Sequence, residues 1–150
     1  MANKKKIALI NGPNLQATGQ RQTHIYGDRS FDDFFQELSK AYADLAELSY
    51  FQSNIEGKLI DALYGYRETH NGIILNAGAY THTSLALADA VAAMNIPVIE
   101  VHISNIFSRE QIRHQSLIGA YCVGVIAGFG LKSYQLALSF LTAETGVMIS

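Results

Sequence analysis

Five short apolar segments alternate with stretches of helical periodicity along this chain. Rich in Ile, Val and Leu, they cover residues 7–10, 48–51, 73–75, 98–101 and 122–126. Most are apolar at consecutive positions instead of at every second one, which is typical of strands covered on both faces. Strands of this kind that alternate with helices predict an α/β fold, a doubly wound sheet of five parallel strands with helices on both faces.

Polar residues at the expected helix starts support this interpretation. Ser30, Asn54 and either Thr83 or Ser84 precede apolar residues spaced by three and four, so each is expected to cap a helix. A further amphipathic helix is expected over residues 133–142. The sequence has no repeat, linker or low-complexity segment that would divide it into two domains.

Composition limits the partners of the chain. Its 150 residues hold 11 Lys and Arg against 13 Asp and Glu, which leaves no concentrated basic face for nucleic acid. No apolar run approaches the roughly 18–20 residues of a membrane span. Only 16 % of residues are charged, where about a quarter is usual, and we expect an oligomer that buries part of its surface. The single cysteine, Cys122, excludes an internal disulfide, and a cytoplasmic location is expected.

The residues that follow the predicted strands are rich in amide, hydroxyl and imidazole groups. Because ligands of such sheets bind beyond the carboxyl ends of the strands, these loops are the expected site. They lack the Asp cluster of a response regulator and the Gly-Lys-Ser/Thr of a phosphate-binding loop. Gly128 and Gly130 are best explained by a tight turn. Residues 12–31 form an unusually long connection, and we expect a lid over the site at about 17–28, the alternative being a surface excursion.

Several of these side chains admit two explanations when each is taken alone. Arg21 and Tyr26 lie five residues apart on the expected lid, where they could pair for chemistry or simply stack at the surface. Glu100 and His102 are two residues apart on a strand and therefore share a face, where a carboxylate would fix the imidazole tautomer and favour its protonated form. A buried histidine held for structural reasons is the other possibility.

The order and spacing of the motifs, from residue 7 to about 138, resemble type II 3-dehydroquinate dehydratase. The segments that carry the resemblance are Asn11-Gly12-Pro13-Asn14-Leu15, Gly19, Arg21, Tyr26-Gly27, Gln52-Ser53-Asn54, Asn76, Gly78-Ala79-Tyr80-Thr81-His82-Thr83-Ser84, Glu100-Val101-His102-Ile103-Ser104-Asn105, Arg109-Glu110, Arg113-His114, Gly128-Phe129-Gly130 and Ser133-Tyr134. The resemblance implies a flavodoxin-like fold and a single catalytic domain over 1–150. It also implies a lyase that removes water from 3-dehydroquinate through an enolate to give 3-dehydroshikimate. That reaction would serve shikimate (aromatic amino acid) biosynthesis or quinate catabolism, with neither metal nor cofactor, in a cytoplasmic homododecamer built as a tetramer of trimers.

The resemblance also implies the role of each site residue. Tyr26 would be the base, and the permanently charged Arg21 would lower the pKa of its phenol from about 10. His102, oriented by Glu100, would protonate the leaving hydroxyl, and Asn14 would hold an ordered water against the enolate. The substrate-binding residues would be Asn76, His82, Asp89, Ile103, Ser104 and Arg113. Asp89 would act in the site of a neighbouring subunit.

Two other functions fit a flavodoxin-like chain. A binding or regulatory module would keep the pocket without the activity, but the presence of Tyr26, Arg21 and His102 together argues against it. A flavin carrier would bind a phosphorylated cofactor, and the sequence offers no phosphate loop for one. The dehydratase is therefore the function that the sequence favours.

Overall fold

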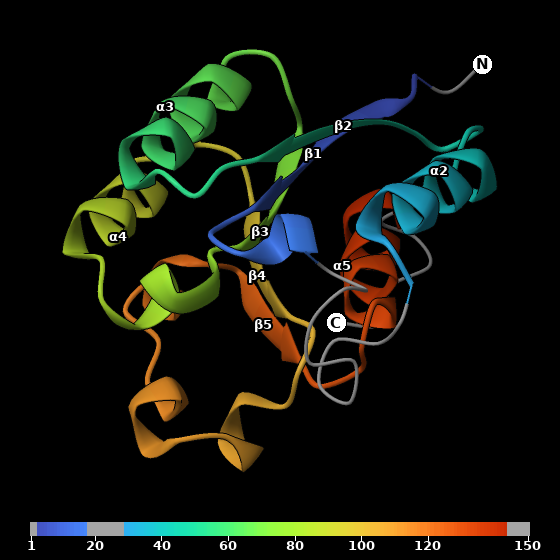
Figure 1. Ribbon diagram of the computed structural model, residues 1–150. Coiled ribbons are helices and arrows are strands. Elements are labelled where there is room, and N and C mark those ends of the chain that lie inside the picture. The colour runs from blue at the N-terminus through green and yellow to red at the C-terminus, as the bar shows by residue number, and fades with distance from the viewer. Residues whose placement is uncertain (1–2, 18–28, 144–150) are drawn as a thin grey trace.

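Five parallel strands form one sheet in the computed structural model, which describes residues 3–17 and 29–143 (Figure 1). They lie in the order β2-β1-β3-β4-β5. The strands are β1 (Lys5–Asn11), β2 (Ala46–Gln52), β3 (Gly72–Asn76), β4 (Val98–His102) and β5 (Gly124–Ala127). This is the flavodoxin-like order, in which the direction of winding reverses between β1 and β3. The predicted fold class is confirmed.

Helices cover the sheet on both faces (Figure 1). The pair α2 (Phe31–Ala41) and α5 (Lys132–Thr142) packs on one face, and α3 (Glu56–Arg67) with α4 (Leu85–Ala92) packs on the other. Short 3-10 helices occupy the loops at Leu15–Ala17, Gly78–His82, Ile106–Ser108, Gln111–His114 and Gly119–Tyr121. Successive strand residues point to opposite faces, so the apolar runs of β1 and β3 supply both cores at once.

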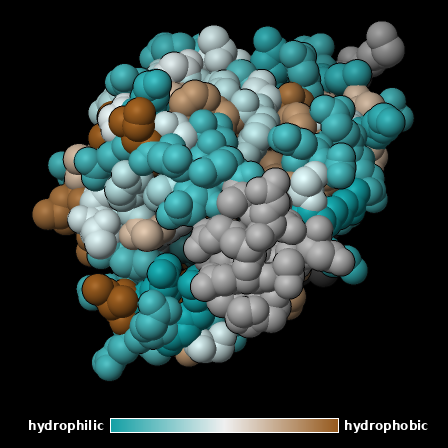
Figure 2. All heavy atoms as spheres, viewed as in Figure 1, coloured by the Kyte–Doolittle hydropathy of each residue, from teal (hydrophilic) through white to brown (hydrophobic). Residues whose placement is uncertain are grey.

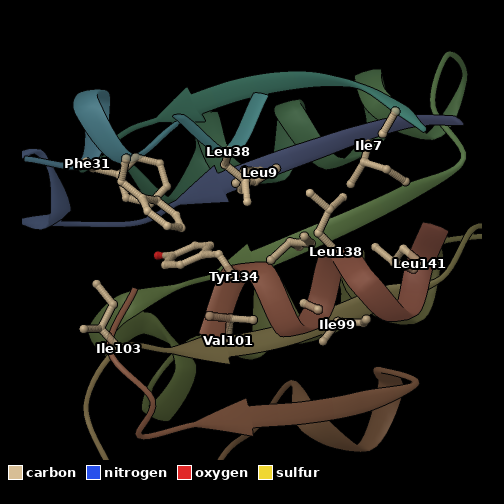
Figure 3. Packing of buried hydrophobic residues seen from close by; sticks show 14 of the residues in the cluster. Ile7, Leu9, Phe31, Leu38, Ile99, Val101, Ile103, Tyr134, Leu138 and Leu141 are labelled. Atoms are coloured by element: carbon tan, nitrogen blue, oxygen red, sulfur yellow. The ribbon is translucent and has the colours of Figure 1, made fainter. Parts of the chain in front are cut away.

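The core between the sheet and the α2–α5 pair is built around Tyr134 of α5. Its side chain is fully buried and lies between Phe31 and Val101 (Figure 3). The Phe31 and Tyr134 rings meet edge to face, with centroids 4.9 Å apart. The phenol oxygen needs a polar partner in this apolar setting, and it has two, the side-chain amides of Asn11 and Asn76.

Two of the predicted helix caps are confirmed and one is wrong. Ser30 Oγ accepts a hydrogen bond from the backbone N–H of Asp33, and Ser84 Oγ accepts one from that of Leu87. The cap of α3 is Ile55, which makes no side-chain capping bond. Asn54 instead accepts the backbone N–H of Asn14 at 2.9 Å, so it joins two loops at the edge of the sheet.

The last strand differs most from its prediction. β5 begins at Gly124, two residues later than expected, and it is not covered on both faces, because Val125 is 49 % exposed. β5 lies at an edge of the sheet, where α5 covers only one of its faces: Ile126 packs against the α2–α5 core, while Val125 on the other face is exposed. Cys122 lies just before the strand, half-buried against the α3–α4 core, and burial raises the pKa of its thiol to about 12.

The face of the molecule drawn in Figure 2 is mainly hydrophilic, and its apolar groups are small and separate. Within the described ranges, no helix combines the length and the apolar character needed to cross a membrane.

Candidate active site

A cleft lies beyond the carboxyl ends of β1, β3 and β4. The side chains that line it come from loops far apart in the sequence, because the strands are parallel and end at the same edge. Seven of the predicted site residues line this cleft: Asn14, Asn76, His82, His102, Ile103, Ser104 and Arg113. The structure therefore brings together most of the site residues that it describes.

The loops after β1 and β3 are packed directly against each other. A Cβ at Gly12 would lie 2.5 Å from the carbonyl oxygen of Ala77, so only glycine permits this approach. Two residues later, Asn14 adopts a left-handed backbone with φ 69°, which is uncommon outside glycine. Asn54 holds that conformation by accepting the Asn14 N–H, and the result is an Asn14 side chain placed at the cleft.

A buried hydrogen-bond network fixes the amide of Asn76 at the end of β3. Its Nδ2 donates to the hydroxyl of Tyr134 at 2.8 Å, and its Oδ1 accepts the N–H of Gly78 at 3.1 Å. Tyr134 in turn donates to Asn11 Oδ1 at 2.7 Å. Burial raises the pKa of the Tyr134 phenol, so it remains a neutral donor. The Asn76 amide therefore reaches the cleft in one fixed orientation.

Tyr134→Phe should lower the free energy of unfolding by about 1–3 kcal/mol, because it leaves Asn11 Oδ1 and Asn76 Nδ2 buried without this partner. Urea titration would measure the loss. Tyr42→Phe is the matched control, since the Tyr42 hydroxyl bonds Ser139 at an exposed position, and its cost should stay within about 0.5 kcal/mol. Equal losses in the two variants would contradict the role given to the buried network.

Glu100 and His102 form a buried carboxyl–imidazole pair beside the cleft. As their spacing on β4 predicts, the two side chains meet, with His102 Nε2 2.5 Å from Glu100 Oε2. Glu100 is fully buried and His102 is 6 % exposed. A carboxylate at Nε2 orients the ring and leaves Nδ1 for the cleft. This arrangement suits an imidazole that delivers a proton to a bound molecule.

His82 stands beside His102, with ring centroids 6.1 Å apart. Its Nδ1 lies 2.7 Å from the carbonyl oxygen of Gln115, a contact that requires the proton to be on Nδ1. Burial lowers the pKa of His82, and the charge that His102 can carry lowers it further. His82 is therefore neutral at neutral pH, and its Nε2 is an acceptor suited to a hydroxyl group.

The charge of the cleft favours an anion. Arg109 and Arg113 line it, and the described lining includes no carboxylate. Arg113 Nε is held by Glu110 at 3.0 Å, and Arg109 Nη1 lies 3.5 Å from Ser104 Oγ. In the part of the chain that the structure describes, no three His, Cys, Asp or Glu side chains gather closely enough to hold a metal ion.

Four predicted site residues are not among those that line this cleft, and one of them, Glu100, lies behind His102 and contacts it. Asp89 lies on an exposed position of α4, and Arg21 and Tyr26 lie outside the described residues, together with nearly all of the expected lid. Conversely, the sequence predicted no role for Arg109 or Tyr134, although both belong to the motifs that carry the family resemblance. Arg109 could have been found as a cation in the loop after β4. Tyr134 could not, because only packing brings α5 beneath Asn76.

The fold and the cleft together define an enzyme of the acid–base type, with its site at the carboxyl edge of a flavodoxin-like sheet. The sequence profile of the family described as dehydroquinase class II matches residues 5–142, and the chain belongs to this family.

Similar proteins agree on this family. The chain is 51 % identical over 136 residues to a 3-dehydroquinate dehydratase of Caldicellulosiruptor bescii, across 89 % of this chain and 94 % of that protein. The crystal structure of a type II dehydroquinase from Butyrivibrio crossotus superposes with a TM-score of 0.89 at 40 % identity, covering 95 % of this chain and all of that one. A type II dehydroquinase from Propionibacterium acnes gives 0.90 at 36 % identity, covering 96 % and 100 %.

Proposed function

We propose that this protein removes water from 3-dehydroquinate to give 3-dehydroshikimate. Its family and its similarity to 3-dehydroquinate dehydratases support this reaction, which belongs to shikimate biosynthesis or to quinate catabolism. The observation that carries the proposal is the Glu100–His102 pair, which opens on a cleft of amides, a neutral imidazole and arginines. An acid among hydrogen-bonding groups is what the loss of a hydroxyl from a polyhydroxylated anion requires.

The proposed mechanism has two proton transfers. A base takes the proton from the carbon next to the ketone, and the electron pair of that C–H bond forms an enolate. Collapse of the enolate breaks the C–O bond one carbon further on, and His102 gives the leaving hydroxyl the proton that makes it water. We assign the base to Tyr26, ionised by Arg21, and the enolate-stabilising water to Asn14.

Substrate binding is assigned to the rest of the cleft. Asn76 and the Ile103–Ser104 segment would hold the carboxylate with amide and backbone N–H groups. Arg113 would donate to a substrate hydroxyl, and the neutral His82 would accept from another, as its bond to Gln115 favours. These groups bind and orient the substrate with no metal or cofactor in the proposed mechanism.

The decisive experiment is the conversion of 3-dehydroquinate by the purified protein, followed by the ultraviolet absorbance of the conjugated product. The proposal requires product to form at the same rate with and without a chelator. A binding or regulatory module would give no product, and a flavin carrier would be yellow. Absence of product with correctly folded protein would refute the proposed function.

We also propose that residues 1–150 form one catalytic domain in the cytoplasm, with a lid at about 17–28, and that twelve copies assemble as a tetramer of trimers. The apolar side chains exposed beside β5 support an assembly, since Val125, Phe129 and Leu136 are 47–63 % exposed. The exposed position of Asp89 suits a residue that completes a neighbouring subunit's site.

The assembly predicts a closed homo-oligomer at micromolar concentration in sedimentation velocity. Asp89→Ala should then lower the activity of the assembled enzyme while its stability stays unchanged, because the side chain is exposed within its own subunit. A stable monomer with full activity would contradict the assembly, and an Asp89→Ala enzyme of full activity would remove Asp89 from the site.

A further inference from the structure

The buried carboxylate of Glu100 has a second hydrogen-bond partner besides His102. The hydroxyl of Ser116 donates to Glu100 Oε1 at 2.6 Å, while His102 occupies Oε2 at 2.5 Å. Each oxygen of this fully buried group therefore has a short hydrogen bond of its own. Hydrogen bonds to an ionised acceptor are among the strongest in proteins, and both act on the group that orients His102.

A second hydrogen bond fixes the direction in which the Ser116 hydroxyl donates. Its Oγ accepts the backbone N–H of Gly119 at 2.9 Å, so its own proton is left to point at Glu100. A Cβ at Gly119 would lie 3.0 Å from Glu100 Oε1 and 3.2 Å from Ser116 Oγ, so a side chain there would crowd both groups. Because Gly119 has no side chain, Ser116 and Glu100 have room for their hydrogen bond.

The loop that carries Ser116 is anchored next to the cleft at both sides of the serine. Gln115 offers its carbonyl to His82, and Leu117 donates its N–H to the carbonyl of Thr81. Both partners lie on the 3-10 helix Gly78–His82, whose residues line the cleft. The position of Ser116 is thereby tied to the substrate side of the site, although Ser116 itself does not line the cleft.

The other ionisable groups around Glu100 do not replace this contact. His82 and Arg113 face the same cleft as His102, and His114 lines the cavity on the other side of Glu100. Cys122 lies close to Glu100 but stays a thiol, because burial, and then the charge of Glu100, raise its pKa. Among these described neighbours, only His102 and Ser116 hydrogen-bond to the carboxylate through their side chains.

We propose that Ser116 is a positioning residue for the general acid: its hydroxyl keeps Glu100 a carboxylate and so sets how readily His102 releases its proton. The inference rests on the proposed function of His102. Without this donor the carboxylate would bind a proton more tightly. The Glu100–His102 pair would then be a weaker acid and would hold its proton to a higher pH.

Ser116→Ala should therefore lower kcat roughly three- to tenfold and move the alkaline limb of the kcat–pH profile upward by about one unit. KM should stay within about twofold, because Ser116 does not touch the substrate site. Glu100→Gln removes the countercharge and should move the same limb downward. Opposite shifts of the alkaline limb in the two variants distinguish the proposed role from general structural damage, which would not shift the limb in opposite directions.

Three further variants complete the test. Ser116→Thr keeps the hydroxyl and should restore the profile, with room for its methyl in the cavity beside Ser116. Ser116→Cys, nearly isosteric and a weaker donor, should shift the limb upward by less, and it serves if the alanine variant does not fold. Ser139→Ala is the control, because it removes a hydroxyl with an equally short 2.6 Å bond on the outer side of α5. It should leave the profile unchanged.

An NMR titration of His102, assigned by the signal lost in His102→Asn, reads the same effect without turnover. A rise in the His102 titration point in Ser116→Ala supports the inference, and an unchanged or lowered point overturns it. The two proposals can fail separately. If the unmodified protein made no product but the His102 titration point still rose in Ser116→Ala, the proposed function would be refuted and the coupling through Glu100 would stand. Turnover with no shift would leave the function and refute the role of Ser116.

Discussion

Tyr26→Phe is expected to lower kcat by a factor of about 10²–10⁴, because the phenyl ring has no group that can take the substrate proton. KM should change little, since the binding groups assigned here are on other loops. The measurement is the initial rate across pH 6–10. A tyrosine held for structure would instead leave kcat near its original value, and that result would withdraw the base assignment.

Arg21→Ala separates the charge of the arginine from the chemistry of the tyrosine. Without a nearby cation the phenol should regain a pKa near 10, and only about one molecule in a thousand would then carry the base at pH 7. Activity should be very low at neutral pH and recover in part as the pH rises, until His102 loses its proton. Tyr26→Phe should show no recovery. A flat alkaline profile for Arg21→Ala would contradict the phenolate assignment.

His102→Asn should lower the rate of water loss by a comparable factor of about 10²–10⁴, because the leaving hydroxyl loses its acid. The base and the enolate-binding groups remain in this variant. Substrate recovered from heavy water should therefore carry deuterium next to the ketone even though little product forms. Tyr26→Phe should give neither deuterium nor product. A His102→Asn enzyme with normal elimination would exclude His102 as the acid.

Glu100→Gln tests the partner of the same acid. The amide keeps the shape of the side chain but removes the negative charge that stabilises a protonated imidazole at His102. The activity of Glu100→Gln should therefore be lost most at alkaline pH, where the protonated form of His102 is already scarce. A pH profile like that of the unmodified enzyme would leave Glu100 without a part in proton delivery.

The fold was largely predictable because strand and helix periodicity are local properties. The apolar runs at 7–10 and 73–75 lie inside buried strands, and Ser30 and Ser84 cap their helices as expected. The exposed edge at β5 was not predictable, since which strand lies at the edge depends on sheet order. Asn54 has the right residue type for a cap, but its side-chain oxygen accepts the backbone N–H of Asn14, 40 residues away, instead of capping α3.

The sequence by itself determined the fold class, the family motifs and the Glu100–His102 pair, because two residues apart on a strand must share a face. Tertiary structure alone decided what surrounds that pair. The bonds from Ser116 to Glu100 and from Tyr134 to Asn76 join residues 16 and 58 positions apart. The physical reason is that parallel strands end together, so loops that are distant in sequence pack at one edge and no local pattern records which atoms meet there.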